Sequence, residues 1–581
     1  PKSWVYRNIG KSDSKIVEMT FDYTDNTMYG ISSTGHATNL VRINLNTGET
    51  TDIGAQSSKV VAMTSVPSED YKSSRIYAVN EDRKLVTIDK ETGKDTTDPD
   101  SSKYDIPAVS YVQSMTYDHS SGYIYWAQVN QAQSSSLYVM DLGEKEMYYA
   151  GVIGNIGSQV AGLYMVPDKD SVPEIPYVEL EDVKLAAEDC VMVKGTKMQL
   201  KAETVPYNAT SQTFTWKTSD KDIADVNEGG EVTAYNEGSA KITVKVTDDK
   251  TGREVSKTIT VKVTEPVENL GGFLMLDNDS LAMNAWISID PQKPETYKVK
   301  SKSGNNVTIG AGAYYNGSLY AYESGTKADD RRSFYKIDEA SGRESEPLGY
   351  VDTKVSDMTF DYSSGIMYAI SGDKNISIVD LASGELTEVC KQDDKVLVTL
   401  AADGKGTLYT IARDDGEKTG KTALYTVDGK KGTLTKIGDT GRNAVLEQSM
   451  TYDMEHGYLY WAQISKSNDA KLCIVDPASG YASPVGTIGE AGSEVSALYC
   501  AYSDEPEAPY VAVKDIKIKQ GSSTTLIKGG QLQLTVSTDP VYATNKAFQY
   551  VSDDTGVVEV SKGGKLTAKK NGTAKITVSI D

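Results

Sequence analysis

The chain contains one stretch twice, as QSMTYDHSSGYIYWAQ at residues 113–128 and as QSMTYDMEHGYLYWAQ at residues 448–463. The two copies align without a gap, and both end in Trp-Ala-Gln. Apolar and polar letters alternate on either side of a Tyr-Asp turn, which is the period of β-strands. The stretch therefore predicts a pair of antiparallel strands that belongs to a larger internal repeat.

The repeat extends outward from this pair into a unit of about four short strands. A strand follows the polar loop, then a D-x-x-[ST]-G turn, and then a last strand. The Asp caps such a turn and the Gly supplies a positive φ. Four antiparallel strands in roughly 40–50 residues predict the blade of a β-propeller. Further units begin near residues 19, 60, 318, 358 and 407.

These units fall into two series, so we predict an all-β chain with two propeller-like lobes, at residues 1–170 and 266–503. The second series counts to about five blades, with residues 495–501 as a candidate strand that closes the ring. The first counts to fewer than four and starts in the middle of a unit. We expect either a lobe truncated at its N-terminus or a single larger ring. Two lobes are favoured because each series ends in a similar inner strand, 160–166 in the first.

Each lobe is followed by a module of another type, at residues 175–265 and 510–581. The first carries KGTKMQL, VPYNAT and GSAKITVKV, and the second carries KGGQLQL, DPVYAT and GTAKITV. These residues resemble the bacterial Ig-like domain of group 2, a small β-sandwich. The resemblance implies a spacer in a secreted or cell-surface bacterial protein, with Trp216 as the core aromatic and Tyr550 in its place in the second copy.

Composition narrows the classes of partner. The formal net charge of -22 over 581 residues argues against nucleic acid, anionic membrane surfaces and sulfated polysaccharides, since each requires a basic face. We found no apolar run of the ~18–20 residues that span a bilayer, and no membrane insertion is expected. The aromatic residues are 37 Tyr, 5 Trp and 6 Phe, which suits either half-buried strands or a surface that stacks sugar rings.

Motifs for catalysis are lacking. There is no G-x-S-x-G elbow, P-loop, H-E-x-x-H or EF-hand loop, and no cofactor or metal is expected. The 82 acidic residues leave a carboxylate pair possible, but no candidate recurs in both lobes. The four cysteines lack metal or disulfide spacing and are expected to be free, mostly buried thiols. We therefore expect a protein that is not an enzyme.

The repeated stretch supplies the candidate binding residues. Its two indoles lie at the ends of strands, beside an amide and before a polar loop, which is a suitable set for a neutral sugar. The alternative is that each indole packs between neighbouring blades as core. An irregular first unit of the second lobe and two later positions add candidates outside the repeat. The predicted ligand-binding residues are Trp126, Gln128, Gln131, Trp461, Gln463, Lys466, Trp286, Tyr322 and Arg332.

In layout, two aromatic-rich lobes with Ig-like spacers on an acidic chain resemble the non-catalytic starch-adherence proteins of gut-bacterial amylosomes. That resemblance implies a groove between two lobes that grips α-1,4-glucan, and a cell-surface multi-enzyme complex as a partner. Our first hypothesis is thus a secreted protein that binds a neutral polysaccharide. The alternatives are a protein-binding adhesin or scaffold, and a propeller lyase or hydrolase.

Overall fold

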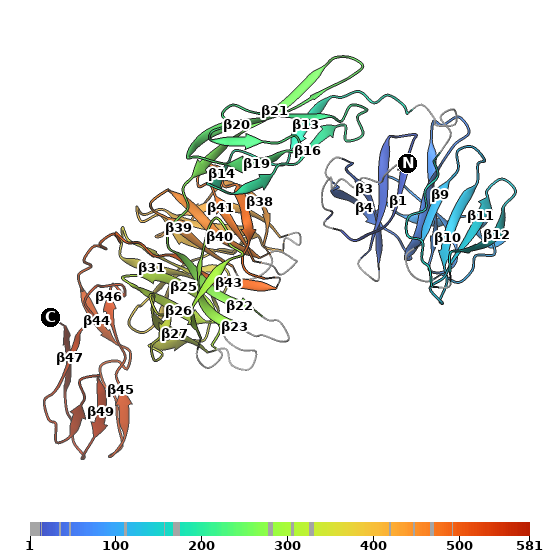
Figure 1. The fold of residues 1–581 in the computed structure, drawn as a ribbon. Helices are drawn as coiled ribbons and strands as arrows, with labels where there is room; N and C mark the ends of the chain where they lie inside the picture. Colours follow the sequence, from blue (N-terminus) through green and yellow to red (C-terminus); the bar gives the residue numbers. More distant parts are fainter. Residues whose placement is uncertain are drawn as a thin grey trace.

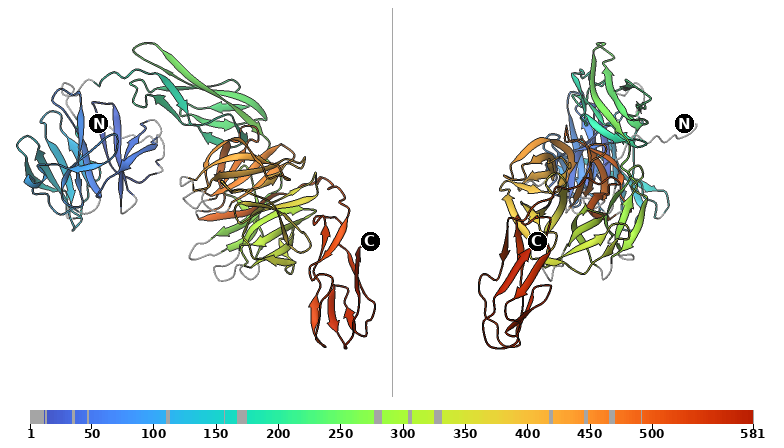
Figure 2. Two further views of the ribbon diagram at one scale, coloured as in Figure 1. Left: turned by 180° about the vertical axis from the view of Figure 1, so that it is seen from behind. Right: turned by 90° about the vertical axis from the view of Figure 1, so that its left-hand side faces the viewer.

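The computed structural model describes residues 12, 14–33, 37–45, 48–109, 113–155, 157–166, 175–276, 283–303, 307–324, 331–416, 420–444, 448–464, 470–490 and 492–580, with the side chains of Leu276 and Met283 left out. These residues form an all-β chain, apart from one 3-10 turn at Ser101–Lys103. Four bodies follow one another along an arc (Figure 1). They are a lobe, an Ig-like module, a second lobe and a second module. Figure 2 shows the same order from behind.

Lobe 1 consists of three four-stranded antiparallel sheets, each built from consecutive strands. The first strands of neighbouring sheets, β1, β5 and β9, pack against one another in an arc. The strands are β1 (Ile16–Asp22), β2 (Thr27–Ser33), β3 (Thr38–Ile43), β4 (Thr50–Ala55), β5 (Val60–Pro67), β6 (Ser74–Asn80), β7 (Leu85–Ile88), β8 (Asp95–Thr97), β9 (Ser114–Tyr117), β10 (Ile124–Val129), β11 (Ser135–Asp141) and β12 (Glu146–Ile153).

The first module is a β-sandwich whose main sheets have the orders β14-β21-β20-β17 and β15-β19-β18. Trp216 on β17 lies over Gly230, where a Cβ would come within 2.8 Å of the indole, so the turn requires glycine. The strands are β13 (Asp182–Leu185), β14 (Cys190–Val193), β15 (Lys197–Gln199), β16 (Ala202–Val205), β17 (Phe214–Thr218), β18 (Ala224–Val226), β19 (Glu231–Ala234), β20 (Gly238–Thr247) and β21 (Glu254–Thr264).

Lobe 2 has five blades, as the sequence predicts. Its last strand, β43, pairs with β22 and so completes the first blade, β24-β23-β22-β43. The inner strands β43, β25, β30, β35 and β39 contact one another in a circle, which closes the ring by packing between separate sheets. The predicted closing role of residues 495–501 is confirmed.

The strands of lobe 2 are β22 (Leu270–Leu276), β23 (Met283–Ile289), β24 (Tyr297–Lys302), β25 (Ile309–Tyr315), β26 (Ser318–Glu323), β27 (Arg332–Asp338), β28 (Arg343–Glu344), β29 (Gly349–Val351), β30 (Val355–Asp361), β31 (Ile366–Ser371), β32 (Asn375–Val379), β33 (Leu386–Lys391), β34 (Lys395–Leu397), β35 (Ala401–Ala402), β36 (Leu408–Asp414), β37 (Lys421–Val427), β38 (Leu434–Asn443), β39 (Ser449–Asp453), β40 (Tyr458–Ile464), β41 (Ala470–Val475), β42 (Ala482–Thr487) and β43 (Ser493–Cys500). The second module contains β44 (Asp515–Ile518), β45 (Gln531–Gln533), β46 (Val536–Asp539), β47 (Phe548–Ser552), β48 (Val558–Val560), β49 (Lys565–Ala568) and β50 (Ile576–Ile580).

The predicted turn chemistry is present. Asp380 accepts a hydrogen bond from the Ala382 N–H at 2.8 Å, and Gly384 has a φ of 71°. The same Asp-to-Gly turn closes with Asp89 and Gly93, whose φ is 69°. All four cysteines are free, and three of them are buried.

One strand prediction is wrong. Residues 160–166 of lobe 1 form no strand, and Tyr164 and Val166 are exposed. The equivalent strand of lobe 2, β43, is held by β22. The described part of lobe 1 has no strand in the position of β22, so the backbone of 160–166 lacks a sheet partner.

Candidate functional site

The predicted indole platforms are buried. Trp126, Trp286 and Trp461 are each 0 % exposed. Trp126 belongs to one buried cluster with Ala62 and Leu85 of the preceding blade, and the other two indoles lie in clusters shared between neighbouring blades of lobe 2. Within the described residues the three indole N–H groups have no hydrogen-bond acceptor.

These indoles cannot stack on a ligand in this structure, so the hypothesis of a sugar platform is corrected in favour of the alternative, a core role. The physical reason is strand alternation. Trp126 and Trp461 lie on the strand face that meets the preceding blade, so each side chain points into that contact.

The paired glutamines of the repeat also have a structural role. Gln128 and Gln463 are buried, and the side-chain amide of each donates a 2.7 Å hydrogen bond to a backbone carbonyl, of Ala108 and Asn443 respectively. Each bond ties the segment that precedes its blade to the second strand of that blade. Both side-chain amides therefore donate within the protein. The prediction that they bind a ligand is not supported by this arrangement.

The remaining predicted residues are scattered. Tyr322 is buried, and its hydroxyl donates to the Gly384 carbonyl. Arg332 is half-buried at the start of β27, where it pairs with Val351 of β29. Gln131 is exposed in a turn, and Lys466 lies outside the described residues. None of the eight described candidates lines the cleft or the two hollows described below.

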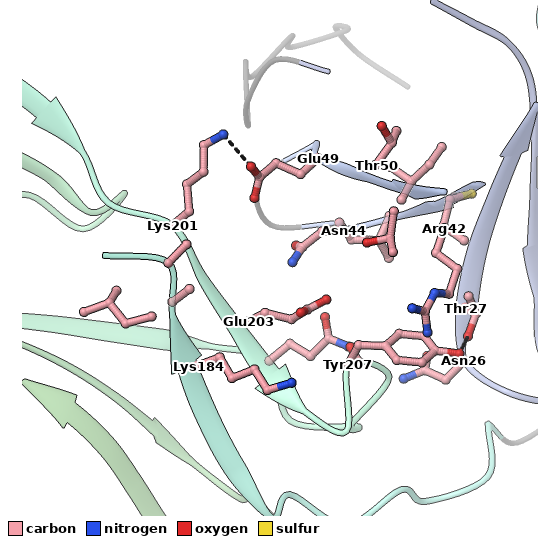
Figure 3. Close-up of a pocket in the computed structure, with 18 residues that line it drawn as sticks. Asn26, Thr27, Arg42, Asn44, Glu49, Thr50, Lys184, Lys201, Glu203 and Tyr207 are labelled. Carbon is pink, nitrogen blue, oxygen red and sulfur yellow. Dashed lines mark hydrogen bonds and ion pairs between the residues drawn. The ribbon is translucent and has the colours of Figure 1, made fainter. Parts of the chain in front are cut away.

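A concave polar site lies elsewhere, between lobe 1 and the first module. The cleft has a volume of about 390 Å³ (Figure 3). The hairpin of β3 and β4 forms one wall and the β13–β16 edge of the module forms the other. Arg42, Asn44 and Glu49 come from the lobe, and Lys184 and Glu203 come from the module.

Hydrogen bonds and an ion pair hold the two walls together. The Asn26 amide donates to the Asn208 carbonyl at 3.0 Å, and the Asn208 amide donates to the Asp25 carbonyl at 2.7 Å. Lys201 forms an ion pair with Glu49. The cleft is thus bounded at both sides by direct contacts between the lobe and the module.

An aromatic ring lies in the wall of this cleft. The Arg42 guanidinium carbon is 3.9 Å from the centroid of the Tyr207 ring, which is cation–π geometry. The Tyr207 hydroxyl lies 3.5 Å from the Thr27 hydroxyl. The pair joins β3 of the lobe to the turn that follows β16, so the arrangement of the cleft depends on both domains.

The second lobe and second module meet through the same surfaces, and there side chains bridge the junction. Asp380 occupies the position of Asn44, and Lys546 forms a 2.6 Å ion pair with it. Tyr542 stands where the first module has Asn208, and it packs beside Tyr368. The first junction therefore keeps an open cleft because small and polar residues replace these bridging side chains.

Another hollow, of about 470 Å³, lies on the inner side of lobe 1 and is lined by Tyr23, Tyr117, His119 and Tyr164. Burial lowers the pKa of His119, which contacts the rings of Tyr23 and Tyr117. In lobe 2 the corresponding surface is the interior of the closed ring, where a hollow of about 30 Å³ remains.

Two buried carboxyl groups link the inner strands. Glu18 of β1 accepts a hydrogen bond from the Ser114 hydroxyl at 3.3 Å, and burial raises its pKa to about 8. Asp357, at the same place in lobe 2, accepts one from Ser449 at 2.8 Å, and burial raises its pKa well above the usual value. Neither group lines the cleft; Asp357 is 0 % exposed, whereas Glu18 is 8 % exposed and lines the hollow on the inner side of lobe 1.

Comparison with known proteins supports the modules most directly. Residues 180–259 and 512–580 each match the family model of the bacterial Ig-like domain (group 2). Both modules are of this type. A curated relative, the lacto-N-biosidase of Bifidobacterium bifidum, is 34 % identical over 102 residues, which span 18 % of this chain and 9 % of that enzyme.

Solved structures add only a general likeness. TolB from Acinetobacter baumannii aligns over 68 % of this chain and 98 % of its own, with a TM-score of 0.26 and 9 % identity. A quinonprotein alcohol dehydrogenase-like protein from Bacteroides thetaiotaomicron aligns over 54 % and 96 %, with a TM-score of 0.24 and 12 % identity. Scores this low carry no argument about activity.

The cleft residues escaped sequence reasoning for an identifiable reason. Arg42 and Tyr207 are 165 positions apart along the chain and belong to different domains. The one available signal was the difference between the two Ig-like turns, VPYNAT and DPVYAT, which places Asn208 where the second copy has Tyr542.

Proposed function

We propose that this chain is a non-catalytic protein that binds a neutral carbohydrate in the cleft between lobe 1 and the first module. The observation that carries the proposal is the composition of the cleft wall. It presents donors (Arg42, Lys184), an acceptor (Glu203) and an amide (Asn26), and the apolar side chains of Met28 and Ile43 also line it. Sugar hydroxyls both donate and accept, while their C–H faces favour apolar contact.

Size and charge fit the same class of ligand. A volume of about 390 Å³ lies in the roughly 300–1,000 Å³ range of small-ligand sites, and would hold a short oligosaccharide segment. Cations and anions alternate around the cleft, so no single sign of charge dominates. A neutral polyhydroxyl ligand suits such a wall better than a phosphorylated or sulfated one.

The non-catalytic part of the proposal rests on where the perturbed carboxyl groups lie. A glycosidase needs an acid with a raised pKa beside a second carboxylate. Glu18 and Asp357 have raised pKa values, but neither lines the cleft; Glu18 lines the hollow of lobe 1 and Asp357 is fully buried in lobe 2. Two carboxylates, Glu49 and Glu203, line the cleft, and Glu49 forms an ion pair with Lys201.

Starch is the first polysaccharide to test, because the layout of the chain resembles that of starch-adherence proteins. The partial likeness to a lacto-N-biosidase supports a carbohydrate ligand in general. The two Ig-like modules support a location outside a bacterial cell. The proposed partner there is a cell-surface multi-enzyme complex, as the layout resemblance implies. In the part of the chain that the structure describes, no helix has the length and apolarity to cross a bilayer.

Affinity electrophoresis in gels containing amylopectin, followed by a glycan array, tests the proposal. Lys184→Ala and Glu203→Ala should weaken retardation or array binding, whereas Lys217→Ala, an exposed lysine of the same module outside the cleft, should not. Equal binding by all variants would remove the cleft as the site. Release of oligosaccharides from the polymer would overturn the non-catalytic assignment.

A further inference from the structure

The first module contacts both lobes, but through two different kinds of interface. On the side of lobe 2, Val191 and Val193 of β14 are fully buried in one cluster with core residues of that lobe. Lys262 Nζ also lies 3.1 Å from Oδ2 of the buried Asp476. Interfaces between domains of one chain allow relative motion unless they are large and apolar. The shared core therefore fixes the first module on lobe 2.

On the side of lobe 1 the interface is polar and is interrupted by the cleft (Figure 3). At one end of the cleft, Asn26 and Asn208 each donate a side-chain hydrogen bond to a backbone carbonyl of the opposite domain. At the other end, Glu49 forms its ion pair with Lys201. Among the described residues, no buried apolar cluster contains side chains of both lobe 1 and the first module.

The end at Asn26 is anchored from within lobe 1. Lys90 Nζ lies 2.8 Å from Oδ2 of Asp25 and 2.8 Å from Oδ2 of the buried Asp22. The backbone carbonyl of the same Asp25 accepts the hydrogen bond of the Asn208 amide. The reciprocal bonds of Asn26 and Asn208 thus join the module to a turn that the lobe holds in place, which gives this end the character of a pivot.

The end at Glu49 is held more weakly. The side chains of Glu49 and Lys201 are 37 % and 39 % exposed. An exposed ion pair of this kind is screened by salt and adds little to stability, because it must hold two flexible side chains in one geometry. Its separation would widen the cleft at this end while the bonds of Asn26 and Asn208 remain.

The second junction, between lobe 2 and the second module, carries a buried bridge in addition. The second module docks there on β30–β33, the blade that aligns with β1–β4 of lobe 1. Lys546 pairs with Asp380, and their side chains are only 16 % and 9 % exposed. The first junction has Gln212 and Asn44 at these two positions. Gln212 donates to the Ala209 carbonyl of its own module at 2.9 Å, so the buried bridge of the second junction has no counterpart at these positions in the first.

We propose that lobe 1 swings on the first module as a hinge. Asn26 and Asn208 form the pivot, and the Glu49–Lys201 ion pair is a latch that controls entry to the cleft. The first module and lobe 2 move as one body. The role of the latch in ligand entry rests on the proposed carbohydrate binding, whereas the hinge itself does not.

Distances between spin labels on the full chain test the proposal. One pair spans the hinge, at Glu69→Cys and Lys217→Cys, and a control pair spans the fixed interface, at Lys217→Cys and Lys436→Cys; all three positions are exposed. Cys390 is replaced by Ser, since the other three native thiols are buried. Raising salt from about 0.05 to 0.5 M should broaden the distance distribution of the hinge pair, because salt screens the latch, and leave the control pair unchanged.

Glu49→Gln removes the charge of the latch. It should raise the population of open conformers at low salt by up to about fivefold and leave little further response to salt. Glu91→Gln, at an exposed acid of the neighbouring blade, is the matched control and should behave like the wild type. A hinge distribution as narrow as that of the control pair in every buffer would overturn the proposal, and so would a Glu49→Gln variant identical to the wild type.

These measurements contain no sugar, so they test the hinge whether or not the cleft binds carbohydrate. Maltoheptaose, added afterwards, should narrow the hinge distribution because a bound ligand contacts both walls. An unchanged width with maltoheptaose would overturn the role of the latch in ligand entry, while the response to salt would still support the hinge.

Discussion

Replacing Glu18 by Gln should remove a loss of stability that lobe 1 suffers as pH rises. Burial raises the pKa of Glu18 from 4.5 to about 8, so the folded lobe binds a proton that the unfolded chain releases above pH 4.5. A raised carboxyl pKa therefore costs stability as pH rises from about 4.5 to 8, and the cost is constant above that window. At about 1.36 kcal/mol per pH unit the full cost is about 5 kcal/mol.

The structure indicates why glutamine should be tolerated. Glu18 Oε1 accepts hydrogen bonds from the Met19 N–H at 3.1 Å and the Ser114 hydroxyl, and a Gln carbonyl can accept both. Oε2 has no partner among the described residues, so no donor loses its acceptor on substitution. Asp357 differs, because its Oδ2 accepts from two backbone N–H groups. Asp357→Asn should therefore destabilise lobe 2 at every pH when the amide faces those donors.

Hydrogen exchange with mass spectrometry suits this test, since unfolding of a four-body chain is not two-state. Protection factors for peptides of β1 and β9 should fall between pH 5 and 8 in the wild type and change far less in Glu18→Gln. Glu69→Gln, at an exposed position in the same lobe, is the control and should follow the wild type. An identical pH response in Glu18→Gln would refute the reasoning.

Three further predictions concern packing. Trp126→Ala should lower the stability of lobe 1 by about 3–5 kcal/mol, seen as an earlier calorimetric transition, and a folded variant that loses only ligand binding would contradict the core role. Lys546→Met should leave the nearly buried Asp380 carboxylate without its ion pair and loosen the contact between lobe 2 and the second module. Limited proteolysis should then cleave the 504–515 link faster, and an unchanged cleavage rate would contradict a stabilising role for this ion pair. Gly384→Ala should destabilise lobe 2 by about 1–3 kcal/mol, because its Cβ would come 2.6 Å from Phe334 at a φ of 71°, and an unshifted melting transition would show that Phe334 can move.

The sequence alone determined what depends on local pattern. The period of two, the Asp-to-Gly turns and the two copies of the Ig-like motifs specified strands, blades and modules, because each is set by neighbours along the chain. The closing strand at 495–501 was predictable because its repeat position leaves it without a blade of its own. The wrong strand at 160–166 shows the limit of this reasoning, since a strand also requires a partner that local letters do not reveal.

Only the tertiary structure decided which side chains are accessible. The repeated Trp126 and Trp461 are equally suitable, by sequence, as a ligand platform or as core, and packing between blades assigns them to the core. The cleft brings Arg42 and Tyr207 together across two domains, and the first module covers β42 of lobe 2, which no local pattern predicts. Accessibility is a property of the surfaces that meet in space, and a linear sequence specifies those meetings only through the fold.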